Sequence, residues 1–115
     1  MLRCTLTGPR FVVELDDTTA IIGDRRLFMC ELSVKVAAAT WYKDGRVIEH
    51  DGDKYVIYVW GHHHRLIIHD VNADDAGQYS AVFNDIGLST AATLTVFEGA
   101  YDYSIYYCFS TKLGY

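Results

Sequence analysis

The chain has 115 residues, which is enough for one domain of ordinary size and a short extension. Half of the residues are hydrophobic, so a core can be buried, and the formal net charge of -5 comes without any cluster of Lys and Arg. This balance argues against sequence-independent binding to nucleic acid or to an anionic membrane surface. No apolar run approaches the roughly 20 residues that span a bilayer.

Short runs of alternating apolar and polar residues predict β-strands along most of the chain. Residues 11–22 are expected to form an edge strand in two halves, which switches from one sheet to the other. Seven further strands are predicted, at residues 25–34, 39–43, 46–48, 54–60, 65–70, 78–83 and 88–97. Asp44-Gly45 predicts a tight turn, and the run from Gly61 to His64 is expected to be a solvated hairpin loop.

The stretch Asp75-Ala76-Gly77-Gln78-Tyr79 predicts a turn that leads into a buried strand, with the Tyr hydroxyl bonded to backbone upstream. This is the tyrosine corner of Greek-key sandwiches. Cys30 lies eleven residues before Trp41, in the order that an immunoglobulin domain uses at the centre of its core. The fold class is therefore an all-β Greek-key sandwich, with a core centred on Cys30, Trp41, Leu66, Tyr79 and Ala81.

The three cysteines do not predict a core disulfide. The position that would pair with Cys30 in a secreted immunoglobulin domain is Ala81, two residues after Tyr79. Cys4 and Cys108 are expected to be free thiols; the alternative is a bridge between them, which requires the C-terminal tail to double back along the domain. Three features favour an intracellular protein: reduced cysteines, a start without the apolar segment of a secretory signal, and the lack of an Asn-x-Ser/Thr site.

Several pieces of the chain together resemble the intermediate-set (I-set) immunoglobulin domains. They include Trp41-Tyr42-Lys43-Asp44-Gly45, Arg65-Leu66-Ile67-Ile68 and the corner ending at Tyr79. The first two resemble modules of the giant muscle proteins of the titin, obscurin, twitchin and myosin light-chain kinase type. This resemblance implies residues 1–8 as a lead-in, residues 9–98 as an I-set domain and residues 99–115 as a Tyr-rich C-terminal extension.

The same resemblance implies a non-catalytic structural or scaffolding module, which acts by protein–protein contact in the cytoplasm, in the sarcomere or the cytoskeleton. Two alternatives stay open. One is an extracellular adhesion or receptor domain, which would pair Cys30 and carry glycans. The other is a regulatory domain beside a muscle-type protein kinase.

Two features suggest protein contacts. Trp60 ends a strand where the core requires no second Trp, so it either anchors a partner or packs on its own hairpin. In the extension, Tyr101, Tyr103 and Tyr107 would share one strand face, which predicts pairing with a sheet edge of this chain or of another immunoglobulin domain, with weak homodimerisation. The alternative is an interdomain segment ordered by a following module.

Catalytic, metal and cofactor sites are not predicted. The histidines of residues 62–64 lack Cys or carboxylate partners at metal-ligand spacing, and the paired acids sit at turns, where Asp bonds to nearby backbone. No nucleophile elbow, phosphate-binding glycine loop or Cys-x-x-Cys occurs.

Overall fold

A computed structural model describes residues 8–98. They form nine strands, β1 (Phe11–Val13), β2 (Thr18–Ile21), β3 (Arg26–Leu32), β4 (Thr40–Lys43), β5 (Arg46–Ile48), β6 (Tyr55–Trp60), β7 (His63–Ile68), β8 (Gly77–Phe83) and β9 (Leu88–Phe97). Two single turns of 3-10 helix, η1 (Ala73–Asp75) and η2 (Asn84–Ile86), flank β8. Neither turn is long or apolar enough to cross a membrane, nor is any other helix of the described residues.

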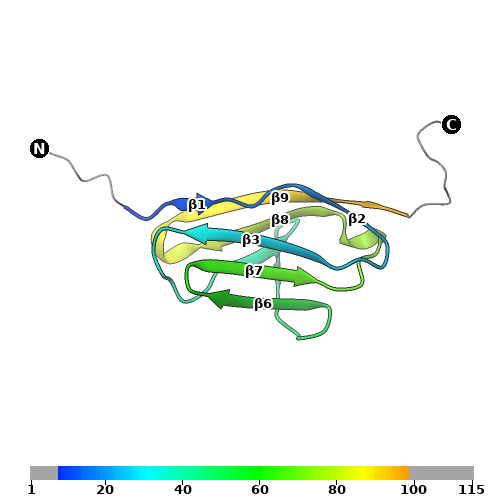
Figure 1. The fold of residues 1–115 in the computed structure, drawn as a ribbon, viewed down its shortest axis with the longest axis horizontal. Helices are drawn as coiled ribbons and strands as arrows, with labels where there is room; N and C mark the ends of the chain where they lie inside the picture. Colours follow the sequence, from blue (N-terminus) through cyan, green and yellow to red (C-terminus); the bar gives the residue numbers. More distant parts are fainter. Residues whose placement is uncertain (1–7, 99–115) are drawn as a thin grey trace, which may run out of the picture.

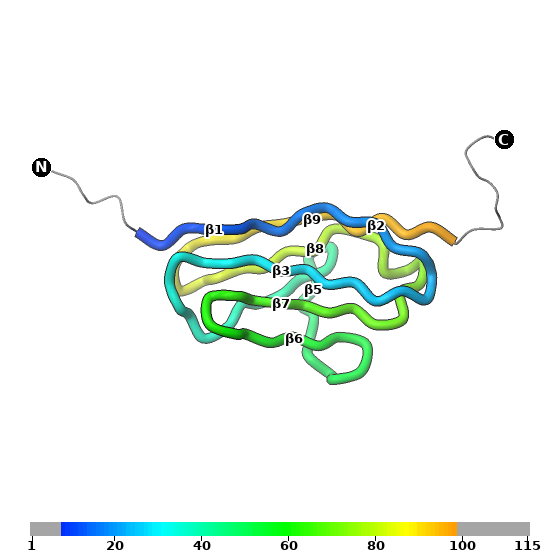
Figure 2. The backbone as a smooth tube through the Cα atoms, viewed as in Figure 1, coloured from blue at the N-terminus to red at the C-terminus, as the bar shows by residue number. Residues whose placement is uncertain are grey.

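The strands build two packed sheets, with the orders β1-β3-β7-β6 and β2-β9-β8-β4-β5 (Figure 1). All neighbours are antiparallel except β2 and β9, which run parallel. The predicted switch within residues 11–22 is confirmed, because β1 belongs to the first sheet and β2 to the second. The chain enters at one end of the sandwich and leaves β9 at the other (Figure 2).

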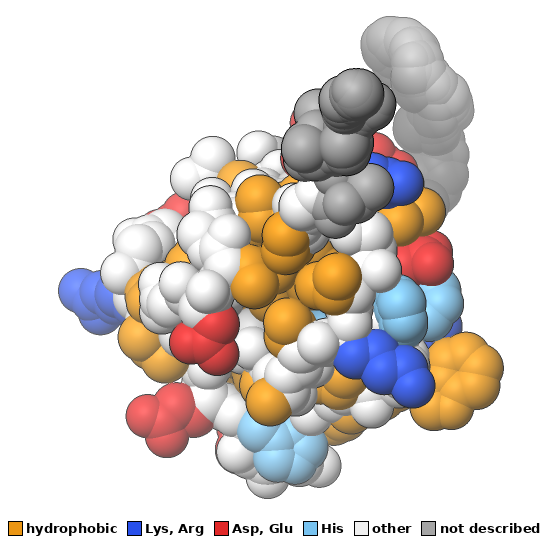
Figure 3. Space-filling view, turned by 90° about the vertical axis from the view of Figure 1, so that its left-hand side faces the viewer, with side chains coloured by type: hydrophobic (Ala, Val, Ile, Leu, Met, Phe, Trp, Pro, Cys, Tyr) orange, Lys and Arg blue, Asp and Glu red, His pale blue; other side chains and the backbone are white. Residues whose placement is uncertain are grey.

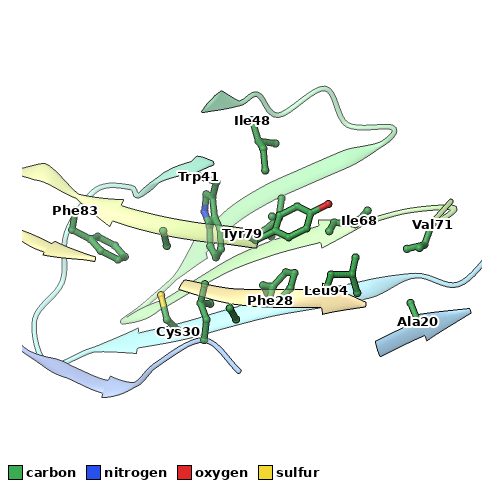
Figure 4. Packing of buried hydrophobic residues seen from close by; sticks show 14 of the residues in the cluster. Ala20, Phe28, Cys30, Trp41, Ile48, Ile68, Val71, Tyr79, Phe83 and Leu94 are labelled. Carbon is green, nitrogen blue, oxygen red and sulfur yellow. The ribbon is translucent and has the colours of Figure 1, made fainter. Parts of the chain in front are cut away.

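The core lies between the sheets, as the alternation predicted. Every second residue of β3 and of β8 is buried, namely Phe28, Cys30, Leu32, Tyr79, Ala81 and Phe83. Trp41 pairs in register with Ala81 and is 1% exposed, and its indole points into the layer that contains Cys30 (Figure 4). Cys30 is a free buried thiol, so packing takes the place of the intersheet disulfide.

The corner before β8 is built from two linked contacts. Asn72 and Asp75 form a capping box around η1. The side chain of Asn72 accepts a backbone N–H at the Asp75 end of the turn, and the side chain of Asp75 accepts the backbone N–H of Asn72. The Tyr79 hydroxyl donates to the carbonyl oxygen of Asp75 at 2.6 Å, and Lys54 Nζ lies 2.6 Å from Asp75 Oδ2. The corner thereby ties β8 to the start of β6.

The predicted solvated loop at residues 61–64 is wrong. Only Gly61 and His62 form the turn, and His63 and His64 are the first residues of β7. Gly61 has φ 62°, the conformation that the first central residue of a type II′ turn requires, so two residues suffice to close the hairpin. His64 is consequently fully buried, opposite Cys30 of β3.

Candidate interaction surface

The solvent-facing side of the β1-β3-β7-β6 sheet is unusually apolar. The register places three rows across β3, β7 and β6, and these nine residues are named here the outer face: Leu27, Ile67 and Val56; Met29, Arg65 and Tyr58; Glu31, His63 and Trp60. The exposed side of an antiparallel sheet normally carries polar side chains. Of these nine residues only Arg65, Glu31 and His63 are charged or histidine, so the face has the composition of a contact surface.

Trp60 is the most exposed large hydrophobic residue of the outer face. Its side chain is 69% exposed, because it ends β6 immediately before the two-residue turn and no further strand covers that edge. On one side it stacks on His63, with 5.9 Å between ring centroids and an interplanar angle of 26°. The sequence left open whether Trp60 anchors a partner or packs on its own hairpin. The structure shows that one side of the ring packs on its own hairpin and that most of the side chain is exposed.

Arg65 and Tyr58 form the centre of the outer face. Arg65 Nη1 donates to the Tyr58 hydroxyl at 3.1 Å, and the guanidinium carbon lies 5.8 Å from the centre of the Tyr58 ring. Arg65 makes no ion pair within residues 8–98. Its positive charge is therefore held in place by an aromatic ring and remains available to an acceptor on a partner.

Trp, Tyr and Arg are the residue types that carry most of the binding energy at protein interfaces. The outer face holds one of each within two neighbouring rows, together with the exposed aliphatic side chain of Leu27. The arrangement suits a contact with a protein surface.

The predicted core residues provide no reactive group. Burial raises the pKa of the Cys30 thiol to about 12, so the thiol stays protonated and is a poor nucleophile. Burial likewise raises the pKa of Tyr79, and it lowers the pKa of His64, to which neighbouring His63 adds a smaller electrostatic effect. Among the described residues no group of three His, Cys, Asp or Glu side chains could hold a metal ion.

The end of the sandwich at which the chain enters carries a smaller apolar area. Figure 3 shows hydrophobic side chains gathered across the middle of this end. A shallow, mainly polar hollow of about 170 Å³ lies at the same end, lined by residues of the β3–β4 connection and of the β8–η2 segment, among them Asn84 and Asp85.

Of the residues predicted to contact partners, Trp60 lies in the outer face, whereas Tyr101, Tyr103 and Tyr107 lie outside the described residues. Tyr58, Arg65 and Met29 of the outer face were not predicted from the sequence. The alternation within residues 54–60 was a signal for Tyr58, because it shares a strand face with Trp60. Arg65 and Met29 could be placed beside them only once the register was known.

Comparison with known proteins identifies relatives for most of the described residues. The family model for the immunoglobulin I-set domain matches residues 9–96. Slow-type myosin-binding protein C of Homo sapiens is 37% identical over 84 residues, which cover 72% of this chain and 7% of that protein. Fast-type myosin-binding protein C of Mus musculus is 30% identical over 90 residues, which cover 78% of this chain and 8% of that protein.

Titin of Drosophila melanogaster is 31% identical over 90 residues, covering 78% of this chain. The chain spans no more than 8% of the length of any of these three relatives. Among solved structures, titin domain I10 is 29% identical with a TM-score of 0.69, covering 77% of this chain and 98% of that one. Titin domain M4 is 27% identical with a TM-score of 0.70, covering 77% of this chain and 95% of that one.

Proposed function

Because this chain belongs to the immunoglobulin I-set family, we propose that it serves as a non-catalytic spacing and docking module of a large muscle or cytoskeletal protein in the cytoplasm. Its relatives in titin and myosin-binding protein C support a place in the sarcomere. The path of the chain supports the spacing role, because it enters and leaves the sandwich at opposite ends (Figure 2). Modules built in this way can follow one another along a filament.

The docking role is assigned to the outer face, with Trp60 as its anchor. The observation that carries this assignment is the 69% exposure of Trp60 beside the Arg65–Tyr58 pair. A largely exposed Trp gains most from a partner that removes it from water. Arg65 adds an unpaired positive charge in the next row, which favours an acidic or carbonyl-rich patch on the partner.

Filaments of purified muscle myosin are the first probe, since two of the relatives are myosin-binding proteins by name. Co-sedimentation of the full chain with these filaments measures the affinity. Trp60→Ala is expected to weaken binding by about tenfold or more, in line with the loss of an interface anchor. Phe97→Ala is the matched control, because Phe97 is 56% exposed but belongs to β9 of the other sheet.

Equal weakening by Trp60→Ala and Phe97→Ala would show that the outer face is not the docking surface. If the wild-type chain stays in the supernatant, myosin filaments are not the partner. Both variants must keep the thermal midpoint of the wild type, which their exposure leads us to expect.

The second proposed mode of contact is pairing of a sheet edge with another immunoglobulin domain. Its basis is the alternation of Tyr101, Tyr103 and Tyr107 in the extension, which would let this segment add a strand and form a weak homodimer. Light scattering of the full chain and of a chain ending at Glu98 tests it. If the full chain dimerises and the shortened chain does not, the extension acts as an assembly strand. If both chains are monomers, the extension is a linker.

A further inference from the structure

Strand β6 is the longest edge strand of the sandwich, and its own sequence carries none of the residues that usually protect an edge. β1, β2, β5 and β6 end the two sheets, and only β6 exceeds four residues. Its sequence Tyr-Val-Ile-Tyr-Val-Trp contains no charge and no Pro, and its pairing with β7 runs without a bulge from Tyr55 to Trp60. Edges of this kind pair with other strands unless something covers them.

Alternation along the ladder determines which backbone groups face the open side. The carbonyl of Lys54 accepts from the N–H of His69 at 2.9 Å, so Lys54 and the residues two and four further on direct their backbone groups to β7. Tyr55, Ile57 and Val59 therefore direct theirs to the open side. These three residues offer the N–H and C=O groups that an added strand would use.

Residues 50–52 cover the first half of this edge and are named here the edge cap. Asp51 Oδ1 accepts the N–H of Tyr55 at 2.9 Å, and the N–H groups of Asp51 and Gly52 donate to the Tyr55 carbonyl at 3.2 and 3.1 Å. The N–H of Ile57 donates to Nδ1 of His50 at 3.0 Å. Within residues 8–98 nothing comparable covers Val59.

We propose that β6 is a latent pairing edge for a second copy of this chain, and that His50 keeps it closed. An antiparallel pair centred on Tyr58 places Ile57 of each copy opposite Val59 of the other. Four hydrogen bonds then form between the open-side groups of Ile57 and Val59. With His50 in place, the Ile57 N–H of each copy is already occupied and the imidazole lies where the second strand would run.

Side chains and charges of β6 match a second copy. In the antiparallel pair Tyr58 meets Tyr58, and Val56 of one copy meets Trp60 of the other, which covers the most exposed ring of the outer face. No charged side chain lies in β6 to repel its counterpart. Asp51 and Asp53 precede the strand and His62 and His63 follow it, so the acidic end of each copy meets no acidic side chain of the other.

This inference goes beyond the contacts proposed above, because the pairing strand is β6 and not the C-terminal extension. The test compares self-association of the full wild-type chain with that of His50→Ala by light scattering at several concentrations. We expect His50→Ala to raise the association constant by about tenfold or more, because it frees the Ile57 N–H of both copies and lets the four hydrogen bonds between the two strands form. Self-association and co-sedimentation with myosin filaments are measured independently. If His50→Ala does not raise self-association, the proposed contact with myosin filaments is unaffected.

Val59→Pro in the His50→Ala chain is the decisive second variant. It removes an N–H that faces the open side and spares the ladder to β7, so the added self-association should disappear while the fold remains. Tyr58→Lys and Tyr58→Glu test the register in the same background. Each should be monomeric alone, and a mixture of the two should form a heterodimer.

Three outcomes overturn the proposal. A folded His50→Ala chain that keeps the wild-type association constant would show that His50 does not close the edge. Self-association that survives Val59→Pro runs through another surface. Removal of residues 99–115 that abolishes the added association assigns it to the C-terminal extension.

Discussion

The imidazole of His64 meets the ring of Phe83 edge-on, with 4.8 Å between the ring centroids and an interplanar angle of 80°. His64 comes from β7 of one sheet and Phe83 from β8 of the other, so this contact joins the two layers. His64 is fully buried, and neither of its ring nitrogens has a hydrogen-bond partner among the described residues. A charge on this ring would have no compensation, so the folded domain holds it neutral.

The domain should lose stability in mild acid. Burial lowers the pKa of His64 in the folded state, whereas the unfolded chain takes up the proton near the ordinary value of about 6.5. The unfolded state therefore binds more protons below that pH, and the free energy of unfolding falls from about pH 6.5 down to the folded-state pKa. One such group contributes at most about 1.4 kcal/mol per pH unit, which urea titrations between about pH 8 and 5 measure.

His64→Leu should remove this pH dependence. It should also stabilise the domain at pH 7 by about 1 kcal/mol, because two buried nitrogens without partners are replaced by apolar surface. His69→Leu is the matched control, since His69 is only partly buried in the same strand region and should leave the pH dependence in place. A His64→Leu chain with the wild-type dependence on pH would assign the effect to another group.

Tyr79→Phe should cost about 1 to 3 kcal/mol of unfolding free energy. The change removes the buried 2.6 Å hydrogen bond to the Asp75 carbonyl and leaves that carbonyl without its donor. Tyr58→Phe makes the same chemical change at a hydroxyl whose bond to Arg65 is exposed, and should cost less than about 0.5 kcal/mol. Chemical denaturation of both variants decides, and equal costs would mean that the corner bond adds nothing.

Gly77→Ala should destabilise the domain through Asp44. Gly77 has φ 151°, and a Cβ built there would lie 2.6 Å from Asp44 Oδ2, whose carboxylate also accepts the N–H of Gln78. We expect a cost of about 1 to 3 kcal/mol from strain and displacement. In a double-mutant cycle, Asp44→Ala should recover part of this cost; strict additivity would show that the backbone conformation alone is responsible.

Trp41→Ala should cost about 3 to 5 kcal/mol and bring the domain close to unfolding, because it empties the centre of the core. The same substitution at Trp60 should cost under about 1 kcal/mol, since that side chain is largely in water. Thermal unfolding of the two variants provides the comparison. A loss below about 1 kcal/mol at Trp41 would place the core elsewhere.

Local patterns were sufficient for much of the architecture. The order of Cys30 and Trp41, the corner ending at Tyr79 and the turn at Asp44-Gly45 follow from short-range chemistry, and the structure places them as expected. Asp44 and Gly45 have φ 51° and 85°, the positive values that a two-residue hairpin turn demands. The histidine run was wrongly predicted to be a loop, because polar residues beside a Gly normally indicate one.

By itself, then, the sequence determined the sandwich, its inward-facing strand positions and its lack of a core disulfide, because these depend on a period of two and on residue types at turns. Only the tertiary structure decided that His64 is buried, that His50 reaches the open edge at Ile57, and that Trp60 and Arg65 share one face. Each of these depends on strand register, and a shift of one residue would turn every side chain of the strand to the opposite face.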